Sequence, residues 1–399
     1  MSAGLLNKMI YPITPAAAGV IRDSHYAFSN QTQGFEKCVL LEGGSTNLAL
    51  GSNLFGDGTY WQNPNHFVLT PAPSIVAGQT ATRHLNNGDS SGLNFRAQTV
   101  GTFVNGQTDT FYVIVENDPT MPATTMRMGI YDTSGGGGPV NSIDFNWATH
   151  VTTNASGGGL HGAVQLDDTR WLVWANATGN PSGIGGGGNP REVFVYPSGS
   201  FVNGQAAILH HAQLEPNQSL PTSPIITVGT PKNRNPDSLT FPATPTLPLT
   251  LYIRFINLGT TEVGAFNGHI IGLGRGASIA NTFLIISGGL GEIAARFYNH
   301  ATTTTTEQSG RIATFNDVVE IRATLDTTGI PTLGISINGD AETVSTVSGI
   351  TPDPTWTQNI LTLTVNGDGT SNAGFHGLTH VHIEQGIQTM DYMRAKARA

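Results

Sequence analysis

The sequence predicts a two-domain, all-β chain that ends in one short helix. Its 399 residues are enough for two domains of ordinary size. Only 11% of the residues are charged, and 50 are glycine, a composition typical of many short strands joined by tight turns. No long stretch repeats with the 3.6-residue period of an amphipathic helix.

Strand-forming runs fill the first half of the chain. Residues 111–115 and 171–174 are rich in aromatic and β-branched side chains, which favour strands. Residues 126–131 and 192–196 alternate in polarity, as half-buried strands do. Glycine-rich loops separate these runs and serve either as ordinary connections or as a binding or packing rim. The three loops are 134–139, 154–159 and 182–190.

A proline-rich connector, residues 226–248, separates the two predicted domains. Prolines recur between residues 216 and 248 and predict a stiff, extended segment, although residues 220–228 could instead run along the first domain as an edge segment.

Asn338-Gly339 predicts a turn within the second half. The second-half strand candidates are 249–255, 282–286, 294–298, 318–324, 332–337, 361–365 and 377–385.

The two ends of the chain differ from its body. Pro12, Pro15 and Gly19 prevent a long helix, so residues 1–34 are predicted to be an irregular arm that either wraps its own domain or docks onto a neighbouring protein. Thr389 can cap a helix that runs to the C-terminus. The predicted division is 1–34 (arm), 35–225 (first domain), 226–248 (linker), 249–388 (second domain) and 389–399 (helical tail).

Charge and cysteine content exclude several classes of protein. The net charge is -9 and no basic stripe is present, so nucleic-acid binding is not expected. Cys38 is the single cysteine, which rules out an intrachain disulfide. No apolar run reaches the length of a membrane span, and Lys8 lies inside the N-terminal segment rather than before an apolar stretch, so we expect neither a membrane helix nor a secretory signal.

Two motifs resemble the structural proteins of tailed bacteriophages. Residues 40–55, an apolar pair followed by Glu, Thr-Asn-Leu, Ser and Phe, together with the pair Tyr60-Trp61, resemble the opening of a domain in many such proteins. Ala212-Gln213-Leu214-Glu215 resembles its closing strand, and residues 221–224 and 234–241 fill the place of the connector that follows. The resemblance implies a jelly roll related to carbohydrate-binding modules.

The second half resembles a concanavalin A-like sandwich of the laminin-G type. The residues that carry this resemblance are 322–326, 334–339, 374–377 and 381–386. Proteins of this kind are found in phage particles as tail fibres, tail-tip adhesins, head spikes and decoration proteins. The fold class expected from both resemblances is two β-sandwiches, a jelly roll and then a concanavalin A-like domain.

The sequence shows no recognisable pattern of catalytic residues. A retaining glycosidase needs two carboxylates about 5 Å apart. Asp167 and Asp168 are adjacent and would point to opposite faces of a strand, and the three-residue spacing of Asp317 and Glu320 would also separate them. We therefore expect no enzyme and no catalytic residues, with a glycan-degrading virion enzyme as the weakest alternative.

Metal ligands are present only as incomplete sets. His380 and His382 would face the same side of a strand, a spacing that zinc can use, but no third ligand is evident. Asp340 and Asp368 lie in turns that could contribute to a calcium site, although they lack the EF-hand spacing. No cofactor is predicted, and calcium is the one ion that these loops could hold.

The tryptophans are the predicted glycan contacts, since an exposed aromatic face can stack on a sugar. The alternative for each is packing in the core or between subunits. Trp171 and Trp174 must lie on opposite sides of their strand. The candidates are Trp61, Trp147, Trp171, Trp174 and Trp356.

Together these features predict a virion protein on the surface of a phage particle, a tail fibre, tip adhesin or head spike that contacts host surface polysaccharide. The alternative is a capsid or tail decoration or scaffold protein without a ligand. Residues 1–34 would attach the chain to other virion proteins because they are apolar enough to be buried. Scarce charge favours a homo-oligomer, with a trimer as the expected state.

Overall fold

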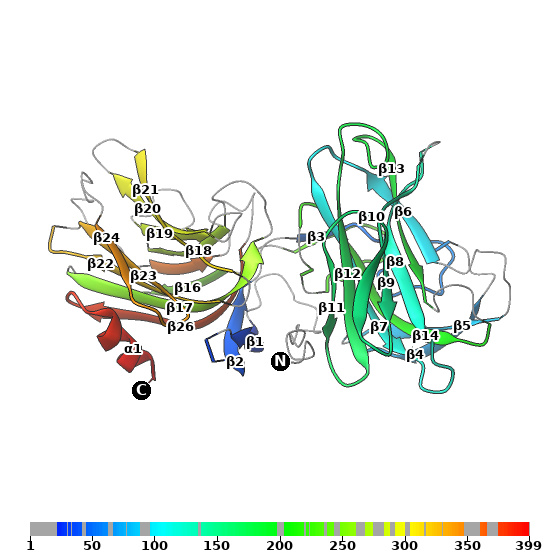
Figure 1. The fold of residues 1–399 in the computed structure, drawn as a ribbon, viewed down its shortest axis with the longest axis horizontal. Helices are drawn as coiled ribbons and strands as arrows, with labels where there is room; N and C mark the ends of the chain where they lie inside the picture. The colour runs from blue at the N-terminus through cyan, green and yellow to red at the C-terminus, as the bar shows by residue number, and fades with distance from the viewer. Residues whose placement is uncertain are drawn as a thin grey trace. The chain divides into compact units, whose positions relative to one another are not determined.

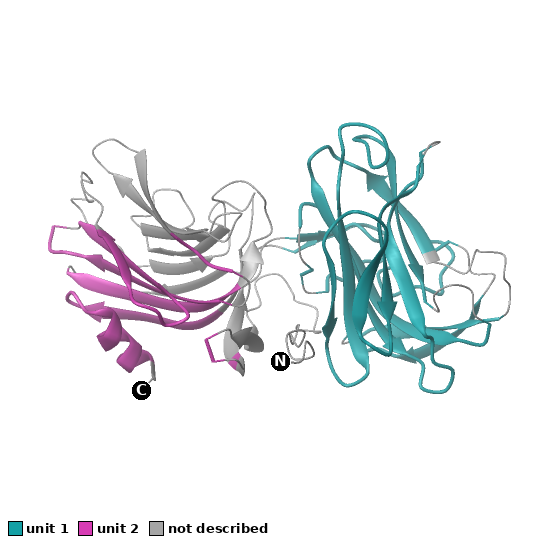
Figure 2. Cartoon of the chain, in the orientation of Figure 1, with its two compact units in different colours: residues 1–17, 45–234 teal, residues 18–44, 235–399 magenta. Residues whose placement is uncertain are grey.

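The computed structural model confirms an almost all-β chain with one short C-terminal helix, built from antiparallel sheets that form sandwiches (Figure 1). The chain divides into unit 1, Met1–Ala17 with Ser45–Arg234, and unit 2, Ala18–Gly44 with Asn235–Ala399 (Figure 2). The structure describes residues 22–29, 31–32, 34–41, 45–62, 67–76, 78–87, 96–134, 137–197, 203–218, 221–222, 224–234, 238–242, 248–260, 268–273, 283–287, 292–299, 304–314, 317–328, 330–346, 360–364 and 374–398.

Unit 1 is a sandwich of two antiparallel sheets. The five-stranded sheet has the order β10 (Val151–Gly157), β9 (Pro139–Asn146), β8 (Thr125–Asp132), β13 (Pro190–Tyr196) and β6 (Arg96–Thr102). The six-stranded sheet has the order β11 (His161–Gln165), β12 (Arg170–Thr178), β7 (Thr108–Asn117), β14 (Ala206–Glu215), β5 (Thr80–Asn86) and β4 (Phe67–Pro73). A short ladder of β3 (Ser45–Asn47) and β15 (Lys232–Arg234) completes the unit.

Alternate side chains of these strands form one hydrophobic core. Phe111, Val113 and Val115 of β7 belong to it from one sheet, and Met126 and Met128 of β8 belong to it from the other. All five are fully buried. Each such side chain contributes roughly 1.5–3 kcal/mol when it leaves water, which explains why the strands alternate as they do.

Asn47 joins three segments of unit 1 through a fully buried amide. Its Nδ2 donates to the carbonyls of Ala212 at 3.3 Å and Ile225 at 2.8 Å. Its Oδ1 accepts from the backbone N–H of Ala49 at 2.9 Å and of Leu214 at 3.2 Å. The two motifs that resemble phage proteins therefore meet at this side chain.

Glu215 lies beside this junction and is also fully buried. Its carboxyl accepts a hydrogen bond from the Ser45 hydroxyl at 2.5 Å and from the Thr222 N–H at 2.8 Å. Burial raises the pKa of Glu215 above its ordinary value, although these hydrogen bonds oppose the shift. Gln213, two residues earlier, accepts from the Ile225 N–H at 2.6 Å, which holds the connector against β14.

The connector follows unit 1 further than the predicted linker boundaries suggest. The Gly51 N–H donates to the Val228 carbonyl at 2.8 Å, and Arg234 pairs with Ser45 at the end of the β3–β15 ladder. Unit 1 thus extends to Arg234 rather than ending at residue 225. The sequence left two interpretations of the proline-rich segment, a free linker or an edge segment. In the structure, its first part runs along the first domain.

Unit 2 also contains two antiparallel sheets. One has the order β1 (Arg22–Ser29), β2 (Gly34–Leu41), β26 (Gly374–Gln385), β17 (Leu249–Thr260), β22 (Val318–Leu325), β23 (Pro331–Ile337) and β24 (Thr343–Thr346). The other has the order β16 (Ser238–Pro242), β25 (Ile360–Thr364), β18 (Gly268–Leu273), β19 (Phe283–Ser287), β20 (Glu292–Asn299) and β21 (Thr304–Ile312).

The β1–β2 hairpin departs from the sequence-based division. Residues 22–34 were expected in an irregular arm and residues 35–44 in the first domain, but β1 and β2 pair with each other and β2 pairs with β26, with Val39 opposite Leu378. Cys38-Val39-Leu40-Leu41, an apolar run, lies within β2. Strand-forming sequence shows that a segment will pair but not which strand is its partner. Residues 1–21 of the predicted arm lie outside the described residues.

Helix α1 (Met390–Arg398) packs on one face of the seven-stranded sheet. Met390 and Met393 pack against Tyr252, and Thr389 caps the helix by accepting from the Tyr392 N–H at 3.2 Å, as the sequence predicted. The Arg394 guanidinium donates to Glu320 Oε2 at 2.6 Å. No helix in the described residues is long and apolar enough to span a bilayer.

Replacing Arg394 with alanine should release α1 from the sheet. Glu320 is 3% exposed, and a buried carboxylate that loses its cation costs about 3 kcal/mol. A nine-residue helix is marginal without its docking contacts. We expect the amides of α1 to lose hydrogen-exchange protection in Arg394→Ala. Lys396→Ala, a more exposed position on the same helix, is the control. Unchanged protection in Arg394→Ala would show that the apolar contacts suffice.

Acid should destabilise unit 1 through His211, which is fully buried and bonded to Gln213 through Nε2 at 3.1 Å. Burial lowers the pKa of His211 to about 4. The pKa of this side chain in the unfolded chain is about 6.5. Between about pH 6.5 and pH 4 the unfolded chain therefore binds a proton at His211 that the folded chain does not bind. The free energy of unfolding is therefore highest above about pH 6.5. It falls with acidification, by about 2 kcal/mol from pH 7 to pH 5.

Urea denaturation at pH 7 and pH 5, followed by tryptophan fluorescence, measures this loss. Four of the five tryptophans lie in unit 1, so the signal reports mainly on it. His211→Gln should lose most of the pH dependence, whereas His150→Gln, at an exposed position, should keep it. An unchanged pH dependence in His211→Gln would contradict the assignment.

Candidate functional site

One face of the five-stranded sheet in unit 1 combines aromatic and charged side chains. In β8 and β13 the alternate residues Met126, Met128, Ile130, Val193 and Val195 belong to the core, so the residues between them face away from it. We call this surface the aromatic–polar face. Its residues are Arg127, Tyr131, Asp144, Glu192, Phe194 and Tyr196.

Register brings these side chains together. Tyr131 lies opposite Glu192, and Arg127 lies opposite Tyr196. Phe194 makes edge contacts with two rings, at centroid distances of 6.4 Å to Tyr131 and 5.5 Å to Tyr196. Phe194 is only 7% exposed, while both tyrosines remain half-buried. The three rings form a continuous apolar surface that is partly exposed at the tyrosines.

Fixed charges border this aromatic surface. Arg127 forms a two-pronged ion pair with Asp144, with Nε–Oδ1 at 2.8 Å and Nη2–Oδ2 at 2.9 Å. This hydrogen bonding raises the pKa of Arg127 above its ordinary value. The ion pair leaves both side chains partly exposed, so they keep some hydrogen-bonding capacity toward solvent or a ligand.

Glu192 supplies a second carboxyl group on the face, outside the Arg127–Asp144 ion pair. Its side chain is half-buried, and no hydrogen bond or ion pair reaches it from the residues that the structure describes. Burial raises the pKa of Glu192 above its ordinary value. A ligand hydroxyl could supply the missing partner.

Gly129 occupies the centre of the aromatic–polar face, opposite Phe194 on one side and Ser142 on the other. A Cβ at this position would lie 2.3 Å from the carbonyl oxygen of Asn141, so only glycine allows this close approach of β8 and β9. No side chain therefore rises from the middle of the face. Gly129 itself is buried, so the exposed part of the face lies at the side chains around it.

The predicted tryptophan contacts lie mostly elsewhere. Trp61, Trp147 and Trp171 are 0%, 7% and 5% exposed and belong to the core of unit 1. Trp61 also donates its indole N–H to the Gly51 carbonyl at 2.9 Å. Their ring faces are not open to a sugar, which follows from the large apolar area that a buried indole removes from water. These three match the core-packing alternative.

Trp174 is the exception among the described tryptophans. It is half-buried and faces away from Trp171 on the same strand, as the spacing predicted. Its ring lies against Gly162 of the neighbouring strand β11. Trp356 lies outside the described residues.

The predicted histidine pair lies on one face of β26, opposite Arg254 and Tyr252 of β17. His382 Nε2 contacts Glu384 Oε1 at 2.9 Å, and His380 belongs to a separate pocket. Among the described residues, no three histidine, cysteine or acidic side chains are arranged to hold a metal ion.

The acidic candidates for calcium show no cation cage. Asp340 accepts the Ile337 N–H at 2.8 Å and pairs with Arg311 at 2.5 Å, so both its oxygens already serve a turn and an ion pair. Its pKa is lowered by these partners despite burial, which alone would raise it. Asp368 lies outside the described residues.

The aromatic–polar face was missed at the sequence level although its signal was present. The alternation of residues 126–131 and 192–196 places Arg127 and Tyr131 on one side of their strand and Glu192, Phe194 and Tyr196 on one side of theirs. Only the pairing of β8 with β13 brings the two sets together, and that pairing joins segments about 65 residues apart in sequence.

No protein-family profile matches the sequence, and no curated protein is similar to it. Solved structures with a similar fold include CBM40 of the Ruminococcus gnavus IT-sialidase bound to α2,6-sialyllactose, with 15% identity over 38% of this chain and 83% of that chain and a TM-score of 0.28. Tailspike protein 2 of Escherichia coli O157:H7 bacteriophage CAB120 shows 14% identity over 40% of this chain and 23% of that chain, with a TM-score of 0.30. Domains LG4-5 of the mouse laminin α1 chain show 11% identity over 81% of this chain and 93% of that chain, with a TM-score of 0.25.

Proposed function

We propose that this chain is a structural protein on the surface of a bacteriophage particle, a tail-fibre, tail-tip or head-spike component, and that it contacts host glycans through the aromatic–polar face of unit 1. The observation that carries the glycan part is the grouping of two half-buried tyrosine rings, a fixed ion pair and the unpaired Glu192 on one sheet face.

A pyranose matches the chemistry of this face. Its apolar side can stack on Tyr131 and Tyr196, and its hydroxyls can both donate and accept hydrogen bonds. A hydroxyl that donates to Glu192 would relieve a half-buried carboxyl that has no protein partner. The ion pair with Asp144 holds Arg127 in place, so little side-chain entropy is lost on binding.

The virion part of the proposal rests on the sequence motifs. Their residues converge in the structure, since Asn47 of the opening motif bonds to Ala212 and Leu214 of the closing strand. This junction supports the interpretation of the two motifs as a single structural signature. The proposal places the protein at the particle surface as a homotrimer.

The proposed role is non-catalytic. Asp144, the other carboxylate of the aromatic–polar face, is held by both prongs of Arg127 and is not free to act as a nucleophile or base beside Glu192. A glycosidase needs two carboxyl groups with free access to the sugar, one as the general acid and one as the nucleophile or base. The alternative role, a decoration protein without a ligand, is favoured by the low charge content. A measurement of glycan binding distinguishes the two roles.

Truncating the two tyrosines should weaken binding to polysaccharide extracted from the host surface. We expect Tyr131→Ala and Tyr196→Ala each to lower the affinity about tenfold, because a stacked ring contributes about 1.5 kcal/mol. Biolayer interferometry with immobilised polysaccharide measures this change. Trp174→Ala, a half-exposed aromatic outside the aromatic–polar face, is the matched control and should bind normally.

Two results would contradict the glycan proposal. A loss of binding in Trp174→Ala but not in the tyrosine variants would place the glycan elsewhere on unit 1. A complete lack of binding by the intact chain to host polysaccharide would favour the decoration role.

The N-terminal residues should anchor the protein to the particle. Residues 1–21 include Leu5, Leu6, Met9 and Ile10, whose burial against a partner would contribute roughly 1.5–3 kcal/mol each. A deletion of residues 1–21 leaves β1 intact, because this strand begins at Arg22. We expect the shortened chain to fold but not to join particles assembled in its presence. Incorporation at full occupancy, measured by quantitative mass spectrometry of purified particles, would contradict this.

A further inference from the structure

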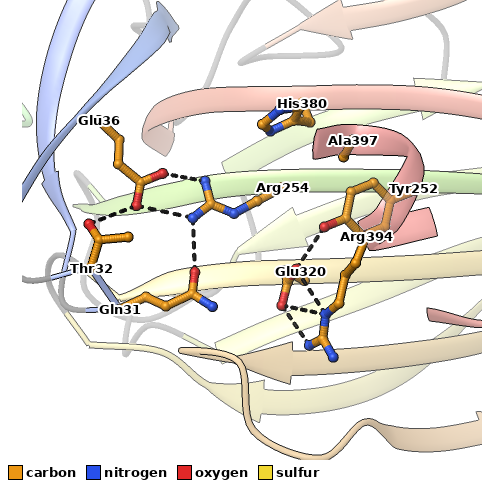
Figure 3. A pocket seen from close by; sticks show the side chains of 9 residues that line it. All are labelled: Gln31, Thr32, Glu36, Tyr252, Arg254, Glu320, His380, Arg394 and Ala397. Atoms are coloured by element: carbon orange, nitrogen blue, oxygen red, sulfur yellow. Dashed lines mark hydrogen bonds and ion pairs between the residues drawn. The ribbon is translucent and has the colours of Figure 1, made fainter. Parts of the chain in front are cut away.

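Unit 2 contains a pocket of about 360 Å³ on the face of the seven-stranded sheet that α1 covers. Tyr252 and Arg254 of β17 line it, and the alternate residue Ile253 is fully buried. The turn between β1 and β2 forms one wall and α1 forms the other, with Gln31 on the first and Ala397 on the second (Figure 3). We call this cavity the helix-side pocket.

The charges of the helix-side pocket are paired within it. Arg254 donates to both oxygens of Glu36, at 2.6 and 3.1 Å, and to Gln31 Oε1 at 2.9 Å. Arg394 makes an equivalent pair with Glu320, whose Oε1 also accepts from the Tyr252 hydroxyl at 2.7 Å. Two cations thus meet two anions, and no net charge remains for an ionic ligand.

The surroundings of Glu320 and Tyr252 shift the pKa values of both groups. Burial alone would raise the pKa of Glu320, but hydrogen bonds from Arg394 and Tyr252 hold it below its ordinary value. Burial and the adjacent Glu320 raise the pKa of Tyr252, so its hydroxyl stays protonated. At neutral pH Glu320 is therefore ionised, and the Tyr252 hydroxyl keeps its proton.

His380 supplies a polar atom without a partner. Its Nδ1 is buried and makes no hydrogen bond. Figure 3 shows the ring beside Ala397, near Arg254 and on the opposite side of the pocket from Gln31. Burial and the charge of Arg254 lower the pKa of His380, against the opposing influence of the Ala397 backbone and of Glu36 and Glu320. A ligand hydroxyl that donates to this nitrogen would give it the partner that it lacks.

We propose that the helix-side pocket binds one neutral pyranose residue, as a second sugar site that is independent of the aromatic–polar face. Hydroxyl groups donate and accept, which suits a lining of guanidinium, carboxylate, amide and imidazole groups. A charged ligand would compete with ion pairs that are already complete. The volume lies near the lower end of the range for small-molecule sites, which fits a single small ligand.

Saturation-transfer NMR on the full chain tests this proposal with free D-glucose, D-galactose and D-mannose as probes. D-glucuronate and D-glucosamine serve as anionic and cationic analogues. The measurement uses the Tyr131→Ala/Tyr196→Ala double variant as background, so any remaining sugar binding does not come from the aromatic–polar face. We expect at least one neutral sugar to bind at millimolar concentration and both charged analogues to bind more weakly.

Two variants locate the binding. His380→Ala should weaken it about threefold to tenfold, as the loss of one hydrogen bond would. His382→Ala, two residues along the same face of β26 and outside the pocket lining, should change nothing. Ala397→Phe, which fills the pocket from α1 without removing a polar group, should abolish binding and decides the matter if His380→Ala does not fold.

Three results would overturn the proposal. Neutral sugars that do not bind, binding that survives Ala397→Phe, or charged analogues that bind as well as the neutral sugars would each do so. Loss of polysaccharide binding in the tyrosine variants is a separate observation, so the two sugar sites stand or fall independently.

Discussion

The buried amide of Asn47 is the constraint on which unit 1 depends. An asparagine side chain has two donor hydrogens and an oxygen that can accept twice, and here four backbone groups from β14, the connector and the chain just after β3 satisfy them. Because an unmet buried amide costs about 1–3 kcal/mol per group, these segments are stable only together. Glu215 and Ser45 reinforce the same junction with a second buried contact. The start, the closing strand and the exit of the unit are thereby fixed at one place, beside the six-stranded sheet that contains β14.

Local sequence was sufficient for several of the elements but not for their partners. The Asn338-Gly339 turn has positive φ at both residues, at 52° and 80°, as an Asn-Gly pair favours, and it joins β23 to β24. The strand at Cys38 was also foreseeable from its apolar run. Its place beside β26 could not be foreseen, because the local sequence of a strand does not show which distant segment will pair with it.

The candidate sites were harder to foresee than the fold. Tryptophan has the largest side chain, so burial in the core of unit 1 was the stronger demand on Trp61, Trp147 and Trp171. The smaller rings of Tyr131 and Tyr196 remain open because they alternate with core residues on strands with one face free. The helix-side pocket needs residues from both ends of the chain, Gln31 and Arg394 among them, and no local pattern could reveal it.

The position of the β1–β2 hairpin determines the order in which the chain can fold as it leaves the ribosome. Unit 1 is complete once Arg234 has emerged, and its first and last strands already pair with each other through Ser45 and Arg234. The hairpin, made earlier, must wait for β26, which begins at Gly374. Throughout that interval its outer strand edges are open to any passing strand, including those of neighbouring nascent chains. These early-made strands are therefore among the last of the described strands to find their native neighbour, and slow translation or crowding on one messenger RNA would favour exchange of this hairpin between copies.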